Sequence, residues 1–221
     1  MRIGLVTDVH SHRGELARAL ELFRDRGVDR VVAIGDTCDA FGRGDGAGEV
    51  AALLDGCSAI GVWGNHDFTL CRDVPAVVRD RYPRGVLDVM ARMQPRLVVG
   101  DCHFSHKESS VDPHDVAQLW DVSDRPDLME RARLAFGAVE SRWQFIGHYH
   151  RWWAATPAGP VEWSGEGPLR FEPGQRYFVV VAAVCDGWCG LLDTDRNELE
   201  PLPCDSVEPV NGSPSQEAWK K

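Results

Sequence analysis

Seven side chains that can bind metal ions stand out because each follows a short apolar segment that predicts a β-strand. They are Asp8, His10, Asp36, Asn65, His106, His148 and His150. In open α/β sheets, ligands bind outside the carboxyl ends of the strands, so we expect these side chains to meet at one edge of a sheet. Taken singly, such residues are mostly turn formers, helix caps or surface residues. Their repetition after successive strands favours a shared site.

The donor atoms of this set predict a transition-metal site. Carboxylates, an amide oxygen and imidazoles, without thiolates, suit Mn²⁺, Fe or Zn²⁺ better than Ca²⁺ or a structural zinc. Seven ligands are too many for one ordinary site, but they suffice for two ions if one carboxylate bridges. Side chains two residues apart on an extended segment point the same way, which pairs Asp8 with His10 and His148 with His150. Asp36, alone in its segment, is the natural bridge.

Alternating strand and helix signals must position these residues. Short apolar runs predict strands at residues 3–7, 28–34, 59–62, 96–99, 103–105 and 143–146. Helical spacing predicts helices at residues 14–26, 49–54, 75–80, 86–93 and 127–139, the last with Pro126 at its first position. After Gly147 the pattern changes to β signals, with a hairpin of residues 177–184 and 188–192 around Asp186-Gly187. This order predicts an α/β fold.

The order of the motifs resembles that of the calcineurin-like metallophosphoesterases, and most closely their small prokaryotic phosphodiesterase-like members. The matching stretches are Asp8-Val-His10, Gly35-Asp36, Gly64-Asn65-His66-Asp67, a later single His, and Gly147-His148-Tyr-His150, within residues 1–195. The resemblance implies an α/β fold in the form of a four-layer α/β/β/α sandwich, two β-sheets flanked by helices. We take residues 1–200 as this single domain and residues 201–221 as a flexible tail.

The resemblance also assigns roles to the site residues. One metal ion would be held by Asp8, His10, Asp36 and His150, and the other by Asp36, Asn65, His106 and His148. His66 would face the phosphate, with Asp67 orienting its ring. The implied reaction is hydrolysis of a phosphomonoester or phosphodiester by a hydroxide that two divalent metal ions activate. Mn²⁺ is the expected metal, with Fe and Zn²⁺ as alternatives. His66 would assist at the phosphate and the leaving group.

The later single histidine has two candidates. In the family this histidine is commonly followed by Gly, whereas Lys107 follows His106. His103 lies three residues earlier and therefore on the opposite face of the strand. We favour His106 because it falls at the strand end, like the other predicted ligands.

Two other functions stay open from the sequence. Protein Ser/Thr phosphatases of this family typically carry an Arg after the second Asp of their GD-x-V-D-R-G motif, but Ala40 follows Asp39. A binding module without turnover is expected to lose metal ligands or His66, and this sequence retains all of them. Both alternatives are therefore disfavoured.

Several other residues allow two interpretations. Trp152, Trp153 and Trp163 either stack on a base or aromatic leaving group or pack under the second sheet. Cys185 and Cys189 could bind metal or form a disulfide. The Gly-rich residues 42–48 lack the Lys-Ser/Thr pair of a phosphate-binding loop and predict a rim loop. Residues 12–13, a His and an Arg, could donate to the phosphate or simply precede a helix in solvent.

The amino-acid composition limits the classes of binding partner that we expect. With 24 basic and 34 acidic residues, the net charge of −10 argues against a general nucleic-acid surface or a polybasic membrane anchor. No apolar run approaches the ~18–20 residues of a membrane span, and the N-terminus does not resemble a signal peptide. The 7 cysteines form no Cys-x-x-Cys pair and predict buried thiols in a reducing compartment. We expect a cytoplasmic enzyme acting on phosphorylated small molecules or nucleotides.

Overall fold

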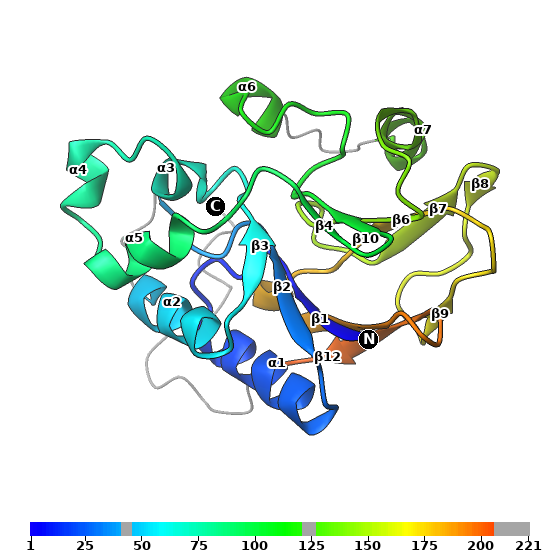
Figure 1. Cartoon of the computed structure of the whole chain (residues 1–221), viewed down its shortest axis with the longest axis horizontal. Coiled ribbons are helices and arrows are strands. Elements are labelled where there is room, and N and C mark those ends of the chain that lie inside the picture. Colours follow the sequence, from blue (N-terminus) through cyan, green and yellow to red (C-terminus); the bar gives the residue numbers. More distant parts are fainter. Residues whose placement is uncertain (41–45, 121–126, 206–221) are drawn as a thin grey trace, which may run out of the picture.

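A computed structural model of the chain describes residues 1–40, 46–120 and 127–205. Its strands form two six-stranded sheets, and helices lie on the outer side of each sheet (Figure 1). The expected four-layer α/β/β/α sandwich is confirmed. Within the described ranges we find no helix whose length and hydropathy would let it span a bilayer.

The first sheet carries the N-terminal part of the site. Its strand order is β3-β2-β1-β11-β12-β9. Three parallel strands form one half, β1 (Arg2–Val6), β2 (Arg30–Ile34) and β3 (Ile60–Val62). The other half is antiparallel and consists of β11 (Trp188–Asp193), β12 (Glu198–Pro203) and β9 (Leu169–Arg170).

The second sheet carries the remaining ligands. Its strand order is β4-β5-β6-β10-β7-β8. The parallel centre comprises β5 (Cys102–Phe104), β6 (Trp143–Ile146) and β10 (Tyr177–Val180). Antiparallel strands flank it, namely β4 (Leu97–Val99), β7 (Trp153–Thr156) and β8 (Gly159–Pro160).

The helices cover the two outer faces. The first sheet is covered by α1 (Arg13–Asp25) and α2 (Ala47–Gly56), and beside them lie α3 (Phe68–Cys71), α4 (Ala76–Arg79) and α5 (Arg84–Met90) (Figure 1). The second sheet side carries α6 (Val116–Leu119) and α7 (Leu128–Ala138). Leu16, Ala19 and Phe23 form the buried stripe of α1, and Gly27 follows with φ +62. The helix therefore ends where the sequence predicted.

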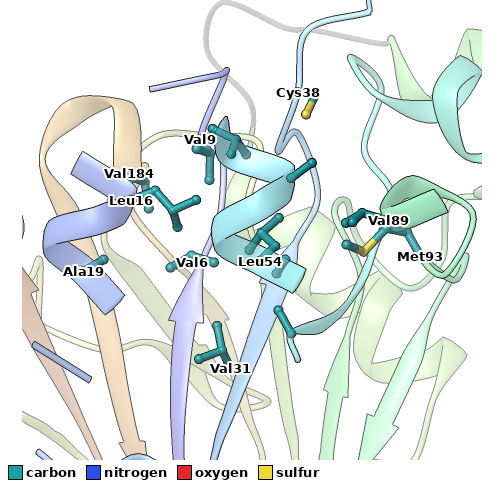
Figure 2. Close-up of a cluster of buried hydrophobic side chains, with 14 of the residues drawn as sticks. Val6, Val9, Leu16, Ala19, Val31, Cys38, Leu54, Val89, Met93 and Val184 are labelled. Atoms are coloured by element: carbon teal, nitrogen blue, oxygen red, sulfur yellow. The ribbon is translucent and has the colours of Figure 1, made fainter. Parts of the chain in front are cut away.

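The period-two alternation of the strands creates separate hydrophobic layers. Ile3 and Leu5 of β1 point between the sheets and belong to one cluster with Phe104 and Phe145 of the second sheet. Val6 faces the other way, toward α1 and α2. Figure 2 shows this outer cluster, with Val6 and Val31 of the strands near Leu16 and Leu54 of the helices. Hydrophobic packing on both faces of β1 and β2 thus fixes the position of their carboxyl ends.

The predicted hairpin of residues 177–184 and 188–192 is wrong. Strand β10 pairs with β6 and β7 of the second sheet, whereas β11 pairs with β1 and β12 of the first. Between them a short 3₁₀ helix, η1 (Val184–Asp186), carries the chain from one sheet to the other. The predicted turn is present, with Gly187 at φ +82. The strands on either side of it, β10 and β11, are both buried, but each lies in a different sheet.

Two predicted boundaries also change. The tail was expected to begin at residue 201, but β12 runs to Pro203 because this stretch pairs with β11 from Trp188 onward. Residues 206–221 lie outside the described part of the chain. Helix α7 begins at Leu128, and the Asp127 carboxylate accepts a hydrogen bond from the Glu130 amide at 3.0 Å. Pro126, expected at the first helical position, lies outside the described residues.

Candidate metal centre

The loops that follow the strands are joined by backbone hydrogen bonds. The amide of Asp8 donates to the Gly35 carbonyl (3.1 Å), and the amide of His10 donates to the Asp36 carbonyl (2.9 Å). On the second sheet, the amide of Gly147 donates to the His106 carbonyl at 3.1 Å. Each pair continues the register of neighbouring parallel strands past their carboxyl ends. The predicted ligands are therefore brought to one edge by the sheets themselves.

Five of the predicted ligands adopt the left-handed backbone region. Their φ angles are Asp8 +49, His10 +45, Asp36 +52, His148 +69 and His150 +49. This region is uncommon for residues other than Gly, and each such residue has a free-energy cost that the surrounding structure must offset. The turns aim side chains into the site instead of continuing the strands. Five of the nine described non-Gly residues with positive φ are predicted ligands, which makes this edge the candidate functional site.

One half of the cluster gathers around Asp8. His150 Nε2 lies 3.4 Å from Asp8 Oδ1, and His10 Nε2 lies 3.9 Å from both Asp8 Oδ1 and Asp36 Oδ2. The other oxygen, Asp8 Oδ2, accepts hydrogen bonds from the Thr7 hydroxyl and the His148 amide. Asp8 Oδ1 is buried and has no hydrogen-bond donor. A buried carboxylate oxygen without a donor, facing two imidazoles, fits a bound cation.

The other half gathers around Asn65. Its Oδ1 lies 3.1 Å from both His106 Nε2 and His148 Nδ1. His106 Nε2 also lies 3.2 Å from Asp36 Oδ2, the oxygen that faces His10. Asp36 therefore touches both halves, as expected of a bridging carboxylate. The structure brings together all seven predicted ligands.

The glycines of two motifs exist because the site leaves no room for a side chain. A Cβ atom at Gly64 would overlap Asp36 Oδ1. A Cβ at Gly147 would overlap the Thr7 hydroxyl and lie 2.7 Å from Asp8 Oδ2. These two glycines are the reason that the GNHD and GHYH motifs can approach the carboxylates.

The electrostatics of the cluster favour charged carboxylates. Burial is the largest single influence and would raise the pKa of Asp8 and Asp36, but the neighbouring imidazoles, His106 foremost, and the hydrogen bonds to these carboxylates together lower both. Burial opposes protonation of His106, yet Asp36 and Asp8 raise its pKa to about 9. For His148, burial and the nearby His106 and Lys107 lower the pKa to about 3. His148 is therefore neutral, the form in which an imidazole binds metal, whereas His106 would have to release its proton when a metal ion binds.

Backbone and side-chain acceptors orient the imidazoles. His106 Nδ1 donates to the Ile34 carbonyl at 2.8 Å, which leaves Nε2 as the atom that could bind a metal ion. His150 Nδ1 lies 3.0 Å from Asp186 Oδ2 and 3.7 Å from Cys185 Sγ. The segment that carries these two residues is fixed beneath the site, because the amides of Val184 and Cys185 donate to the Thr7 and Asp8 carbonyls. These hydrogen bonds hold the chain at the point where it leaves the second sheet after β10 and joins the first sheet as β11.

His66 lies at the mouth of the cluster, but its carboxylate partner differs from the prediction. The His66 and His10 rings meet edge to face with centroids 4.7 Å apart. His66 Nδ1 lies 3.4 Å from Asp39 Oδ1. Asp67, expected to orient this ring, is instead fully buried and accepts hydrogen bonds from the Gly64 amide and from the amide and hydroxyl of Thr37. Asp67 therefore shapes the GNHD turn, and Asp39 meets His66.

The competitor His103 stands apart from the cluster. It is buried in β5 opposite Val98, and its Nδ1 has no hydrogen-bond partner. Burial, with a smaller effect of Arg96, lowers its pKa to about 4. Lys107, which replaces the usual Gly, is buried and donates from Nζ to the Gln118 carbonyl at 2.9 Å. The geometry favours His106 over His103 as the ligand.

Other predicted candidates do not meet the cluster. Trp152 is buried and packs on Trp163, while Trp153 packs on Phe178, so the packing interpretation is correct. All seven cysteines are unpaired, which excludes a Cys185–Cys189 disulfide; only Cys185 reaches the site. His12 is exposed before α1, with Nδ1 3.7 Å from Glu15. Residues 41–45, most of the expected rim loop, lie outside the described residues.

A comparison with protein-family models assigns this arrangement. Residues 1–176 match the model of the calcineurin-like phosphoesterase superfamily domain. The chain belongs to this superfamily. As a calcineurin-like phosphoesterase it is a hydrolase acting on phosphoric ester bonds, and its His and Asp clusters could bind metal.

Solved structures share the fold of this phosphoesterase. A metallophosphoesterase from Sphaerobacter thermophilus has a TM-score of 0.70 at 21% identity, covering 93% of this chain and 89% of that one. An archaeal phosphodiesterase has a TM-score of 0.51 at 18% identity, with 92% and 99% covered. A cold-active protein-tyrosine phosphatase from a Shewanella species has a TM-score of 0.52 at 12% identity, with 93% and 78% covered. No curated protein sequence matches the chain.

Sequence reasoning missed three residues at the candidate site. Asp39 stands in the segment of Asp36, and its spacing alone could have suggested a role near the site. Asp186 was read as a hairpin turn residue, because its proximity to His150 depends on the crossing between sheets. The Trp120 ring lies against the His66 ring with centroids 4.7 Å apart and the planes tilted, although no motif surrounds Trp120. Asp186 and Trp120 are brought to the site by tertiary contacts and not by a local sequence pattern.

Proposed function

We propose that the protein hydrolyses phosphomonoesters or phosphodiesters with two divalent metal ions. The first ion would be held by Asp8, His10, Asp36 and His150, and the second by Asp36, Asn65, His106 and His148. Carboxylate, amide and imidazole donors suit Mn²⁺, with Fe and Zn²⁺ as alternatives. The family assignment supports a phosphoric ester as the substrate.

The observation that carries the proposal is the position of Asp36 between the two groups of ligands. Its Oδ2 faces His106 Nε2 at 3.2 Å and His10 Nε2 at 3.9 Å, while Oδ1 accepts from the His66 amide at 2.8 Å. One carboxylate therefore links both ligand groups to the backbone of the His66 turn. Metal ions held there would lower the pKa of a water and stabilise the entering and leaving oxygens of an in-line displacement.

The chain's own residues would orient the ester and move the proton. His66 lies beside the ligand His10 and remains partly exposed, so an ester held at the ligands can reach it. With Nδ1 turned toward Asp39, Nε2 is the atom left to donate a proton to the leaving oxygen. Asp39 would stabilise the protonated ring that this step requires.

Metal analysis tests the proposal directly. The protein is stripped with a chelator, reconstituted with Mn²⁺, Fe²⁺ or Zn²⁺ separately, freed of excess metal and measured by elemental analysis. We expect two ions per chain, and Asp36→Asn should reduce binding at both positions. A reconstituted protein that retains one ion or none would remove the basis of the mechanism.

A substrate panel then defines the reaction. Each metal form is assayed with p-nitrophenyl phosphate and bis-p-nitrophenyl phosphate, which separates monoesterase from diesterase activity. The solved archaeal phosphodiesterase of the same fold makes the diester the first arm to measure. We expect turnover of at least one substrate, abolished by chelation and restored by metal. Absence of turnover in every metal form, with two ions bound, would favour a binding module.

The cysteines support a reducing compartment for this enzyme. All seven are unpaired, and Cys38, Cys102, Cys189 and Cys204 are buried. Since none of the described cysteines forms a disulfide, we propose a cytoplasmic location. Fractionation of the native cells would test it.

A further inference from the structure

Trp120 places a large aromatic side chain at the edge of the candidate metal centre. Its ring centroid lies 4.7 Å from that of His66, with the planes tilted by 48°. The His66 ring in turn lies 4.7 Å from that of the ligand His10. Trp120 is therefore the direct neighbour of His66, the proposed proton donor, and His66 separates it from the proposed metal ligand His10.

The position of Trp120 is fixed by the site itself. It directly follows α6, whose first turn is capped by Asp115, with hydrogen bonds from the amides of Ala117 and Gln118. Leu119, next to Trp120, is buried. The buried Lys107 donates from Nζ to the Gln118 carbonyl at 2.9 Å. Because Lys107 follows the ligand His106, the loop that carries a metal ligand also holds the helix that presents Trp120.

Trp120 nevertheless keeps much of its surface in solvent. Its exposed fraction is 36%, and none of the other Phe, Tyr or Trp side chains in residues 1–40, 46–120 and 127–205 reaches this value. Trp152 and Trp163 pack on each other, and Trp153 packs on Phe178. An exposed indole costs hydrophobic free energy in the free protein, and a ligand ring that covers it would recover that free energy.

We propose that Trp120 forms one wall of the leaving-group subsite and stacks on a planar ring of the substrate. This inference rests on the phosphoesterase activity and on the role of His66 proposed above. A leaving oxygen within hydrogen-bond reach of His66 Nε2 brings the group bonded to it next to the neighbouring indole. The substrate class is then a phosphoester whose leaving group carries an aromatic ring, because ring stacking is favourable and tolerant of the ring's identity.

Matched substrates and variants test the subsite. The metal-loaded wild type, Trp120→Leu and Trp120→Phe are assayed with two methyl phosphodiesters of comparable leaving-group acidity, one phenyl and one fluoroalkyl. We expect Trp120→Leu to lower kcat/KM for the phenyl ester by about tenfold, mainly through KM, as expected from loss of one stacking contact. The fluoroalkyl ester should change less than about twofold, and Trp120→Phe should lie between. Leu134→Ala, which removes an exposed apolar side chain from α7, is the control and should leave both esters unchanged.

A binding arm keeps this test separate from the test of activity. Calorimetry measures the affinity of phenyl and fluoroalkyl methylphosphonates for the same metal-loaded variants, so no turnover is required. We expect Trp120→Leu to remove the preference for the phenyl compound. If no ester is hydrolysed but this preference is present in the wild type and lost in the variant, the proposed function fails and the subsite stands.

Two outcomes would overturn the proposal. Equal losses on the phenyl and fluoroalkyl esters, with an unchanged affinity preference, would mean that Trp120 acts only by packing on His66. No change on either ester and no preference in the wild type would mean that the indole does not touch the substrate.

Discussion

His150 is held between two carboxylates, with Nε2 3.4 Å from Asp8 Oδ1 and Nδ1 3.0 Å from Asp186 Oδ2. Asp186 comes from the short 3₁₀ helix that connects the two sheets, far from every predicted ligand in sequence. A carboxylate behind a ligating imidazole fixes its tautomer and increases its basicity. The structure therefore gives the candidate ligand His150 a partner that no motif contains.

Replacing Asp186 tests this partnership. Asp186→Asn should weaken binding at the first metal position by about 10- to 100-fold and leave the second nearly unchanged, because only His150 loses its partner. Titration against a competing chelator measures both affinities. Asp73→Asn, at an exposed aspartate paired with Arg72, is the charge-matched control. A loss with Cys185→Ser and none with Asp186→Asn would instead identify the thiol, 3.7 Å from His150 Nδ1, as the partner.

His66 should matter for turnover but not for metal binding. We expect His66→Ala to lower kcat by about 10²–10⁴-fold, the usual effect of losing general acid–base catalysis, with two metal ions retained. Asp39→Asn should give a smaller loss, since the ring stays but its carboxylate neighbour becomes neutral. Steady-state kinetics with elemental analysis separates the two effects. If His66→Ala loses a metal ion, His66 is a ligand and the assignment of roles is wrong.

We expect opposite results from replacing the two candidate histidines, His106 and His103. His106→Ala should weaken the second metal position by at least about tenfold, because Asn65 and Asp36 lose the imidazole that faces them. His103→Ala should leave both metal affinities unchanged, since this residue lies within β5. Metal titration of both variants, with circular dichroism to confirm folding, provides the measurement. A large loss with His103→Ala and none with His106→Ala would contradict the geometry described for β5 and its loop.

Sequence reasoning brought the candidate ligands to one place because each motif follows a strand, and β1, β2, β3, β5 and β6 deliver them to one edge. The chain order of strands and helices also predicted an α/β fold, and the resemblance to the calcineurin-like metallophosphoesterases implied the sandwich. What it missed depends on tertiary contacts. The Asp186-Gly187 turn has a local hairpin signal, yet its strands pair in different sheets. Asp67 has the position of an orienting carboxylate, but burial and three hydrogen bonds commit it to the turn.

Acid stability of the metal-free protein should reveal His103. Burial lowers the pKa of this buried imidazole from 6.5 to about 4, so between these pH values the unfolded chain binds a proton that the folded chain does not. The free energy of unfolding therefore falls as pH falls through this window. The contribution of His103 amounts to roughly 3 kcal/mol across it.

His103→Phe should remove this contribution. Urea titrations of the wild type and variant are run with chelator at several pH values from 7 to 4, because bound metal would otherwise add its own pH dependence. The expected result is a shallower decline for His103→Phe than for the wild type. Parallel curves for the two proteins would show that His103 does not titrate differently on folding.

Gly147→Ala should damage the site through one added methyl group. The backbone at Gly147 is not in the left-handed region, so the substitution tests space alone. The new Cβ would overlap the Thr7 hydroxyl, which donates to Asp8 Oδ2, and would press on that oxygen. We expect a loss of about 1–3 kcal/mol in stability, typical of overpacking, together with weaker binding at the first metal position.

Gly137→Ala is the matched control, because nothing lies within 4 Å of its Cβ position in α7 and the helix should gain about 0.5–1 kcal/mol. Urea unfolding and metal titration measure both variants. Wild-type stability and metal affinity in Gly147→Ala would mean that Thr7 and Asp8 can move apart without cost, and that the close approach of the GHYH turn does not hold the carboxylate in place.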